Sequence, residues 1–159
     1  MVLSEQTGYE VAKVNTGSGS QVRTGVRNNN RAFYKSEELA QAFWEKAKPF
    51  VPAQMGNSVP IGLNELFRFY RYQRGQQFKG HFDESYVRSP QEMSFLTFMV
   101  YLNDNFEGGD TAFRGLRVRP KQGMALIFLH NVYHEGSAVT QGVKYVLRSD
   151  IMYRVTGAS

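Results

Sequence analysis

The sequence contains no cysteine, and this absence removes several kinds of site at once. Without thiols the chain cannot build a disulfide framework, a thiolate zinc site, an iron–sulfur cluster or a cysteine nucleophile. Long hydrophobic runs are also missing: the longest nearly apolar stretch, Phe95 to Leu102, has eight residues, whereas a membrane-spanning helix needs about 20. The first residues, MVLSEQTGYE, lack the basic and apolar regions of a secretory signal. We therefore expect a cytoplasmic protein without membrane association.

Charge is moderate in amount and positive in balance. Nineteen Lys and Arg residues against 14 Asp and Glu give a net charge of +5. This balance favours an anionic ligand or nucleic acid through long-range attraction, although scattered basic residues are more simply those of a solvated surface. A chain of 159 residues that is 42% hydrophobic predicts one globular domain, residues 1–159, rather than a disordered chain.

The pattern of apolar residues changes along the chain. Residues 1–30 are rich in Gly, Ser and Asn, which favours a flexible lid or edge strands near 9–14 and 21–26. Ser36 is a suitable N-cap for a helix over 36–48, which Pro49 ends. Later segments follow the two-residue period of strands and are bounded by Gly, Pro, Asn and Asp, at 65–73, 94–103, 116–119, 124–130 and 143–153. The pattern predicts a mainly β barrel or jelly roll with an N-terminal helix packed on it.

Three residues far apart in the sequence form a candidate metal site. His81 and Asp83 have the i, i+2 spacing that places both side chains on one face of a strand, and His134 follows a strand-like run. Two imidazoles and one carboxylate match the facial triad of non-haem Fe(II) oxygenases. The same ligands would also accept Mn(II), Co(II) or Ni(II), because the order of metal affinities does not favour Fe(II).

Lys144 is a lone cation near the start of the last predicted strand, between apolar neighbours. An ammonium group in such a strand needs a counter-charge unless it reaches solvent. A co-substrate with two carboxylates would supply one, with its 2-oxo acid end on the metal and its far carboxylate on Lys144. The period of two places on one face of this strand Lys144, Val146, Arg148, Asp150 and Met152.

Several motifs resemble the prolyl 4-hydroxylase-like 2-oxoglutarate/Fe(II) dioxygenases. They occur in the expected order as YQRGQQFKGHFD (72–83), FLTFMVYLN (95–103), FEGGDTAF (106–113), PKQG (120–123) and HEGSAVTQGVK (134–144). The resemblance covers residues 60–153 and implies that these form a double-stranded β-helix of the jelly-roll or cupin type. It implies Fe(II) and 2-oxoglutarate as cofactors, dioxygen as a further substrate, and ascorbate as a candidate reductant.

The resemblance also assigns roles by position. His81, Asp83 and His134 match the iron ligands, and Lys144 matches the basic residue that binds the distal carboxylate of 2-oxoglutarate. The tyrosines that match co-substrate contacts are Tyr72 and Tyr101. His130 competes with His134 as a ligand, but it lacks the ten-residue step to Lys144 and the following Glu-Gly, so we rank it as a structural histidine near the site.

One position departs from the family pattern. Peptidyl prolyl hydroxylases usually carry tryptophan six residues after the basic residue, where this chain has Asp150. Asp150 and Arg148 would either contact the substrate or form a partly solvated ion pair of little energetic value. We take Arg68, Arg148 and Asp150 as candidate substrate contacts, which favours a polar or charged substrate over a proline-rich peptide.

The function expected from these features is 2-oxoglutarate-dependent hydroxylation, with release of succinate and CO2. Candidate substrates are a peptidyl residue and a free amino acid or other small metabolite. A nucleobase demethylase of the same superfamily ranks lower, because that branch usually carries arginines after the distal histidine where this chain has Lys144. A jelly-roll protein that binds a metal and a ligand without turnover is the alternative outside enzymes. The sequence leaves the oligomeric state open.

Overall fold

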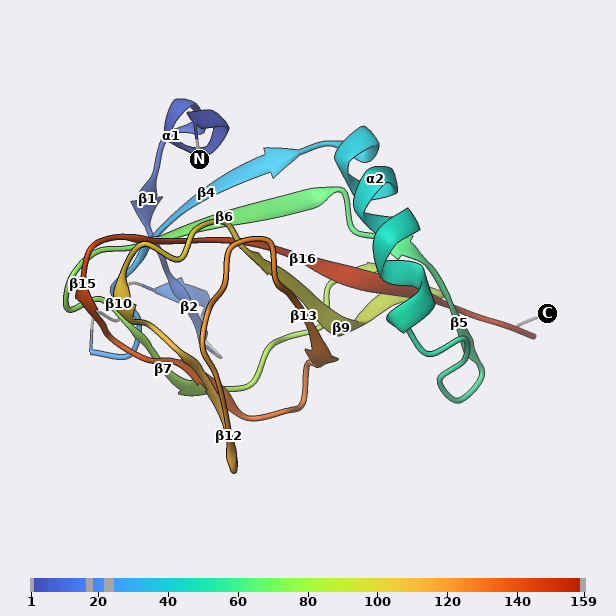
Figure 1. Ribbon diagram of the computed structural model, residues 1–159. Helices are drawn as coiled ribbons and strands as arrows, with labels where there is room; N and C mark the ends of the chain where they lie inside the picture. The colour runs from blue at the N-terminus through green and yellow to red at the C-terminus, as the bar shows by residue number, and fades with distance from the viewer. Residues whose placement is uncertain (1, 17–18, 22–24, 158–159) are drawn as a thin grey trace.

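The computed structural model describes residues 2–16, 19–21 and 25–157, of which strands form the largest part (Figure 1). The helices are α1 (Val2–Thr7), α2 (Glu37–Ala47) and the 3-10 turn η1 (Lys48–Phe50). The strands are β1 (Glu10–Val11), β2 (Val14–Thr16), β3 (Gly19–Gln21), β4 (Asn30–Lys35), β5 (Ser58–Leu63), β6 (Leu66–Tyr72), β7 (Phe78–His81), β8 (Val87–Ser89), β9 (Glu92–Tyr101), β10 (Glu107–Gly108), β11 (Thr111–Phe113), β12 (Leu116–Val118), β13 (Ala125–Leu129), β14 (His134–Gly136), β15 (Val139–Gln141) and β16 (Lys144–Val155).

Two antiparallel sheets make up most of the fold. The larger has the order β1-β4-β6-β16-β9-β13, with β5 paired to β16 and β8 paired to β9. The smaller has the order β12-β11-β14-β7. β16 lies between β6 and β9 and is the longest strand, so it forms the centre of the larger sheet. The mainly β prediction is confirmed.

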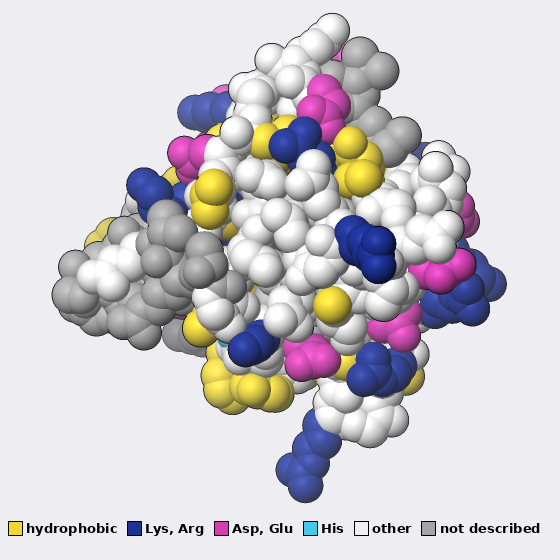
Figure 2. Space-filling model, turned by 90° about the vertical axis from the view of Figure 1, so that its left-hand side faces the viewer, with side chains coloured by type: hydrophobic (Ala, Val, Ile, Leu, Met, Phe, Trp, Pro, Cys, Tyr) yellow, Lys and Arg dark blue, Asp and Glu magenta, His cyan; other side chains and the backbone are white. Residues whose placement is uncertain are grey.

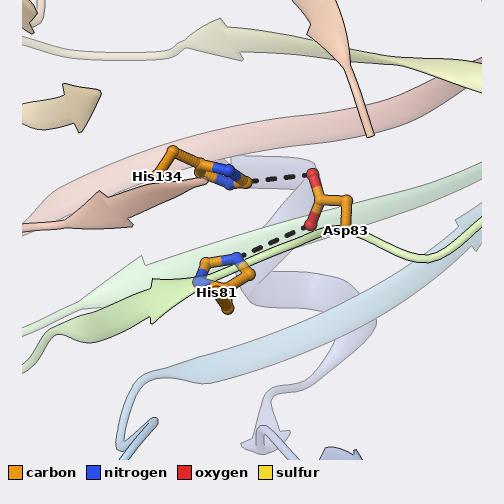
Figure 3. Close-up of side chains that lie close together, drawn as sticks. All are labelled: His81, Asp83 and His134. Carbon is orange, nitrogen blue, oxygen red and sulfur yellow. Dashed lines mark ion pairs between the residues drawn. The ribbon is translucent and has the colours of Figure 1, made fainter. Parts of the chain in front are cut away.

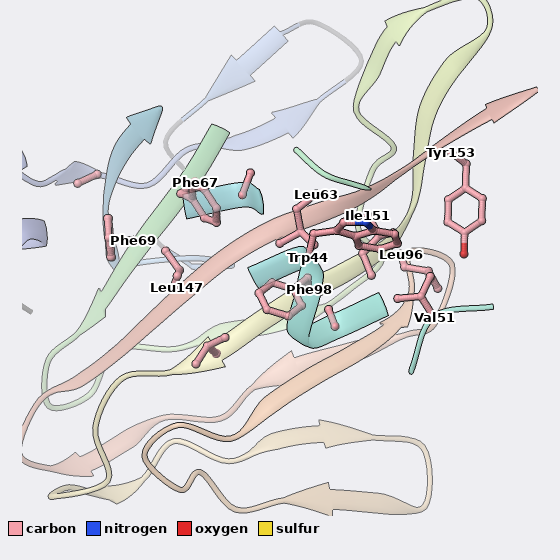
Figure 4. Packing of buried hydrophobic residues seen from close by; sticks show 14 residues of the cluster. Trp44, Val51, Leu63, Phe67, Phe69, Leu96, Phe98, Leu147, Ile151 and Tyr153 are labelled. Atoms are coloured by element: carbon pink, nitrogen blue, oxygen red, sulfur yellow. The ribbon is translucent and has the colours of Figure 1, made fainter. Parts of the chain in front are cut away.

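The two faces of the larger sheet pack against different parts of the molecule. One face packs against α2 through a core that includes Trp44, Phe67, Phe98 and Ile151 (Figure 4). Phe67 and Ile151 are fully buried, and burial of such a side chain contributes about 1.5–3 kcal/mol. The other face turns toward the smaller sheet and carries Tyr70, Tyr72, Tyr101 and Val146, which form a second cluster together with Val139 of β15. Alternation along β6, β9 and β16 therefore separates the structural core from the face that carries the site.

The predicted helix and strands are present with small shifts at their ends. The Ser36 side chain accepts a hydrogen bond from the backbone N–H of Leu39, as expected of an N-cap, and α2 covers 37–47 of the predicted 36–48. The five predicted strands correspond to β6, β9, β12, β13 and β16. Sequence reasoning missed several short strands, among them β7, β11 and β14 of the smaller sheet, because three or four residues are too few to show a period.

The N-terminal segment agrees with the prediction only in part. The edge strand expected near 9–14 overlaps β1 and the start of β2, but the helix α1 was not expected. The strand expected over 21–26 was wrong at Gly25 and Val26, which form a turn, and it overlaps β3 only at Gln21. Its residues 22–24 lie outside the described ranges. Within those ranges, no helix is both long and apolar enough to cross a membrane.

Candidate active site

The two histidines of the predicted triad lie on paired strands of the smaller sheet. His81 ends β7 and His134 begins β14, and these two residues are directly opposite each other in the antiparallel register. Asp83 follows β7 after one residue, and its backbone N–H donates to the carbonyl of His130 at 2.9 Å. One ligand atom from each residue lies within 4.8 Å of the others (Figure 3). The structure thus brings His81, Asp83 and His134 together from segments 51 residues apart in sequence.

Hydrogen bonds orient both imidazoles toward the carboxylate. Nδ1 of His81 lies 2.8 Å from the carbonyl of Lys79, and Nδ1 of His134 lies 2.9 Å from that of Val132. Because a carbonyl only accepts, each Nδ1 carries a proton, and Nε2 is the nitrogen that each ring offers to a metal. The Nε2 atoms lie 3.6 and 3.7 Å from the two carboxylate oxygens of Asp83. Two imidazoles held in this way beside a carboxylate fit a divalent transition metal.

The ionisation states of Asp83 and His134 also fit metal binding. Burial alone would raise the pKa of the Asp83 carboxyl, but Arg148, His81, His134 and Thr97 together hold that pKa well below its usual range. Burial lowers the pKa of His134, which keeps the imidazole neutral near pH 7. A deprotonated carboxylate and neutral imidazoles are the forms that bind metals.

A second layer of polar side chains holds Asp83 in place. The Thr97 hydroxyl donates to Oδ2 of Asp83 at 2.6 Å, so Thr97 Oγ1 accepts from Nδ1–H of His130 at 2.9 Å. The Ser94 hydroxyl then donates to Nε2 of His130 at 2.8 Å, and Ser94 Oγ accepts from the backbone N–H of Tyr86. Both nitrogens of His130 are therefore occupied, which leaves this histidine no free lone pair for a metal. Sequence reasoning missed Thr97 and Ser94, since isolated hydroxyl residues in a strand carry no signal.

Replacing Thr97 by valine is expected to weaken metal binding by about tenfold, because outer-shell partners of metal ligands commonly contribute 10–100-fold. Valine keeps the shape of threonine but removes the donor to Asp83. Competition with a chromophoric chelator would measure the affinity for Mn(II) or Co(II). Thr97→Ser keeps the hydroxyl and should bind as the unaltered chain does. Equal affinity in the valine variant would show that this hydrogen bond does not position the carboxylate.

Lys144 lies at the start of β16, where it is 2% exposed and lines a pocket that also contains the triad. Its ammonium donates to the carbonyl of Gly109 at 2.5 Å and lies 5.2 Å from the Tyr72 ring centroid and 5.4 Å from that of Tyr101. It forms no ion pair with any residue in the described ranges. Burial lowers the pKa of Lys144 to about 8, an effect that Asp110 partly opposes.

The two tyrosines differ in their access to this pocket. Tyr72 lines it, and burial raises the pKa of its phenol, so the hydroxyl is a hydrogen-bond donor at neutral pH. Tyr101 is fully buried, and its hydroxyl lies 2.6 Å from Thr111 Oγ1. Thr111, which the sequence did not indicate, lines the pocket in front of Tyr101. Close approach also explains Gly109, where a Cβ would lie 3.1 Å from the Lys144 side chain and φ is +68°.

The charged residues that we took as candidate substrate contacts are linked to one another. Arg68 lies 2.9 Å from Asp150, and Arg148 lies 3.3 Å from both Asp150 and Asp83. Asp150 is 1% exposed rather than partly solvated, and it lines neither of the two pockets that reach the ligand residues. Arg148 lines two pockets: the inner one that holds Lys144, and an outer one that it shares with Arg68. Both pockets reach His81 and Asp83.

Comparison with known proteins agrees with this geometry. The family model of the 2OG-Fe(II) oxygenase superfamily matches residues 67–149. A putative prolyl 4-hydroxylase of Acanthamoeba polyphaga mimivirus is 31% identical over 80% of this chain and 60% of its own. Probable prolyl 4-hydroxylase 9 of Arabidopsis thaliana is 26% identical over 82% of this chain and 54% of its own, so this chain spans little more than half the length of these relatives.

A solved structure shares the fold as well. The viral collagen prolyl hydroxylase of Paramecium Bursaria Chlorella virus-1, in its 2-oxoglutarate complex, superimposes with a TM-score of 0.62. The two are 21% identical, and the alignment covers 82% of this chain and 81% of the viral one. This likeness confirms the predicted jelly-roll architecture. The family match over residues 67–149, which span both paired histidines and Lys144, shows that the chain belongs to the 2-oxoglutarate/Fe(II) oxygenase superfamily.

Proposed function

We propose that this chain is a hydroxylase that uses Fe(II), 2-oxoglutarate and dioxygen and releases succinate and CO2. One observation carries the proposal: a single pocket between the two sheets is lined both by the three ligand residues and by the buried Lys144. A small diacid joins two such points, because one carboxylate can meet the metal while the other meets the ammonium. The family match supports the same chemistry.

Each group of residues in the pocket would have its own role in this reaction. His81, Asp83 and His134 would hold the Fe(II), which would supply the redox chemistry that turns 2-oxoglutarate, O2 and R–H into succinate, CO2 and R–OH. Lys144 would bind the distal carboxylate of 2-oxoglutarate, and Tyr72, which lines the same pocket, would donate its hydroxyl to the same molecule. The apolar wall formed by residues such as Met99, Phe128 and Val146 would exclude water from the reaction.

The substrate that the comparisons favour is a prolyl residue, either in a peptide or as the free amino acid. The curated relatives are named prolyl 4-hydroxylases, and this supports a peptidyl or amino-acid substrate over a nucleobase. The surface charge points the same way. On the face shown in Figure 2, Lys and Arg side chains are interspersed with Asp and Glu and form no continuous basic track of the kind that follows a phosphate backbone.

The proposal is tested by incubating the full chain with Fe(II), ascorbate and 2-oxoglutarate and measuring succinate. Slow succinate formation is expected without a second substrate, and faster formation with free proline or with prolyl peptides. Mass spectrometry should then show a product heavier by one oxygen. If the protein binds metal and 2-oxoglutarate but forms no succinate under any of these conditions, the chain is a binding protein rather than an enzyme.

A further inference from the structure

The outer pocket beside the metal ligands has a volume of about 280 Å³. Its lining includes His81 and Asp83 but not Lys144, so a substrate in it would lie next to the metal. Its wall carries an unusual number of basic side chains, namely Lys13, Arg27, Arg31, Arg68 and Arg148. The wall also contains Glu84, which is opposite in charge to Lys13, and the side chains of both residues are exposed.

Most of these arginines already have a carboxylate partner. The ion pairs are Arg31 with Glu10 at 3.1 Å, Arg68 with Asp150 at 2.9 Å, and Arg148 with Asp83 and Asp150 at 3.3 Å. Arg27 differs from them. It is 5% exposed and forms no ion pair with any residue that the structure describes.

The local structure holds Arg27 rigidly at the pocket wall. Its Nε donates to Oδ1 of Asn29 at 2.8 Å, and its guanidinium lies between two rings, 4.5 Å from the centroid of Tyr70 and 4.3 Å from that of Phe78. Phe78 in turn stacks on the imidazole of His81, with centroids 3.5 Å apart. One aromatic ring therefore separates the guanidinium from a candidate metal ligand. Nη2 of Arg27 is buried and has no hydrogen-bond partner in the described part of the chain.

A buried guanidinium without a counter-ion is costly, and contacts with aromatic rings compensate for only part of the lost hydration. The positive potential here is strong enough to affect Tyr70. Burial alone would raise the pKa of the Tyr70 phenol, but Arg27, Arg148 and Arg68 around it lower that pKa to about 8. Because Arg27 lines the outer pocket, an anion bound there would lie against its positive charge.

We propose that Arg27 binds a carboxylate of the substrate in the outer pocket, so that the substrate is an acidic molecule. This inference rests on the proposed function and narrows its substrate class. A carboxylate fits better than a phosphate dianion because, among the residues that the structure describes, only one of the four arginines lacks a carboxylate partner, which matches a single negative charge. The carboxylate could be that of a free amino acid or that of an acidic side chain next to the hydroxylated residue in a peptide.

Binding measurements with charge-matched ligands test the proposal. The full chain is loaded with Mn(II) and 2-oxoglutarate, so that binding is measured without turnover. Calorimetry then compares free proline with prolinamide, and an end-blocked prolyl-glutamate dipeptide with its prolyl-glutamine counterpart. In at least one pair the acidic member should bind about tenfold more tightly or better, as expected of a charge-assisted hydrogen bond. The pair that shows the preference identifies which source supplies the carboxylate.

Variants assign the preference to Arg27. In Arg27→Gln the acidic and neutral members should bind within about twofold of each other, whereas Arg27→Lys should keep a smaller preference because it retains the charge without the planar fork. Arg74→Gln removes an exposed arginine outside both pockets and should leave the preference unchanged. Thermal unfolding of each variant checks that it is folded.

Three results would overturn the proposal: equal binding within both pairs, a preference that survives in folded Arg27→Gln, or no binding of either acidic ligand at about 10 mM. The comparison within each pair uses the unaltered chain, so it remains decisive if a variant fails to fold. The succinate assay is a separate measurement. Succinate formation without an acid preference overturns this inference alone, whereas an acid preference without succinate formation overturns the proposed function alone.

Discussion

Asp83→Ala is expected to lower succinate formation by more than about a hundredfold. This exceeds the loss of about 10–100-fold that is usual when a side chain hydrogen-bonded to a metal ligand is removed. Two reasons combine. The variant loses the only carboxylate of the ligand group, and it leaves Arg148 with one of its two ion-pair partners missing inside the pocket. The guanidinium, which lies 3.3 Å from Asp83 in the parent chain, would then have no carboxylate between it and the divalent cation, and its charge would repel that cation. Succinate yield and Mn(II) affinity should fall together.

The matched control for this prediction is Glu38→Ala, which removes an exposed carboxylate in the first turn of α2. It lies on the far side of the larger sheet and should leave both quantities unchanged. His134→Ala should behave as Asp83→Ala does. Substantial succinate formation by Asp83→Ala would mean that the three residues are not the metal ligands, and the proposed function would lose its main support.

Lys144→Met should raise the KM for 2-oxoglutarate by about a hundredfold, because loss of one partner of a buried charge pair typically costs 2–5 kcal/mol in binding. Methionine fills nearly the same volume, so the pocket between Tyr72 and Tyr101 stays occupied. Without bound co-substrate, the variant should be at least as stable as the parent chain, since it removes a buried cation that has no ion pair. Calorimetric titration of the Mn(II)-loaded protein with 2-oxoglutarate would give the affinity directly.

Dependence on pH provides a second readout for Lys144. Its pKa of about 8 means that the ammonium is present below pH 8 and is lost as the pH rises above it. Binding of a carboxylate favours the protonated form, so affinity for 2-oxoglutarate should fall by up to about tenfold per pH unit above pH 8. Lys144→Met should lack this decline, whereas Lys46→Met, at an exposed position on α2, should keep it. If Lys144→Met lost a hundredfold in affinity while the affinity of the parent chain did not change with pH, the result would argue against a carboxylate on Lys144.

The sequence was most informative where long segments repeat a pattern. The faces of β16 are an example, since alternation from Lys144 onward correctly separates residues that face α2 from residues that face the smaller sheet. The candidate ligands were identifiable because histidine is rare in this chain. In addition, the sequence spacings between His81, Asp83, His134 and Lys144 are characteristic of the family that the motifs resemble. Short strands such as β7 and β14 were beyond this approach, although they bring the ligands together.

Other parts of the site depend on contacts that no spacing reveals. Arg27 lies in a polar, glycine-rich segment whose composition indicated only a lid or an edge strand, yet it pairs with β7 through a bridge to Phe78. The role of Asp150 was equally hidden: its place on the same strand face as Lys144 was predicted, but its burial depends on Arg68 and Asn64 from elsewhere in the fold. Such partners become visible only when the strands are placed in register.

The ion pair between Arg148 and Asp83 has a consequence for the metal-free state. Because a guanidinium and the Thr97 hydroxyl already compensate the Asp83 charge, the carboxylate does not depend on a metal ion for its stability. Stripping the protein with a chelator should therefore leave a preorganised apoprotein rather than a collapsed or unfolded one. Reconstitution then becomes an exchange of partners on an existing scaffold, in which the incoming ion shares or displaces an arginine that is already in place.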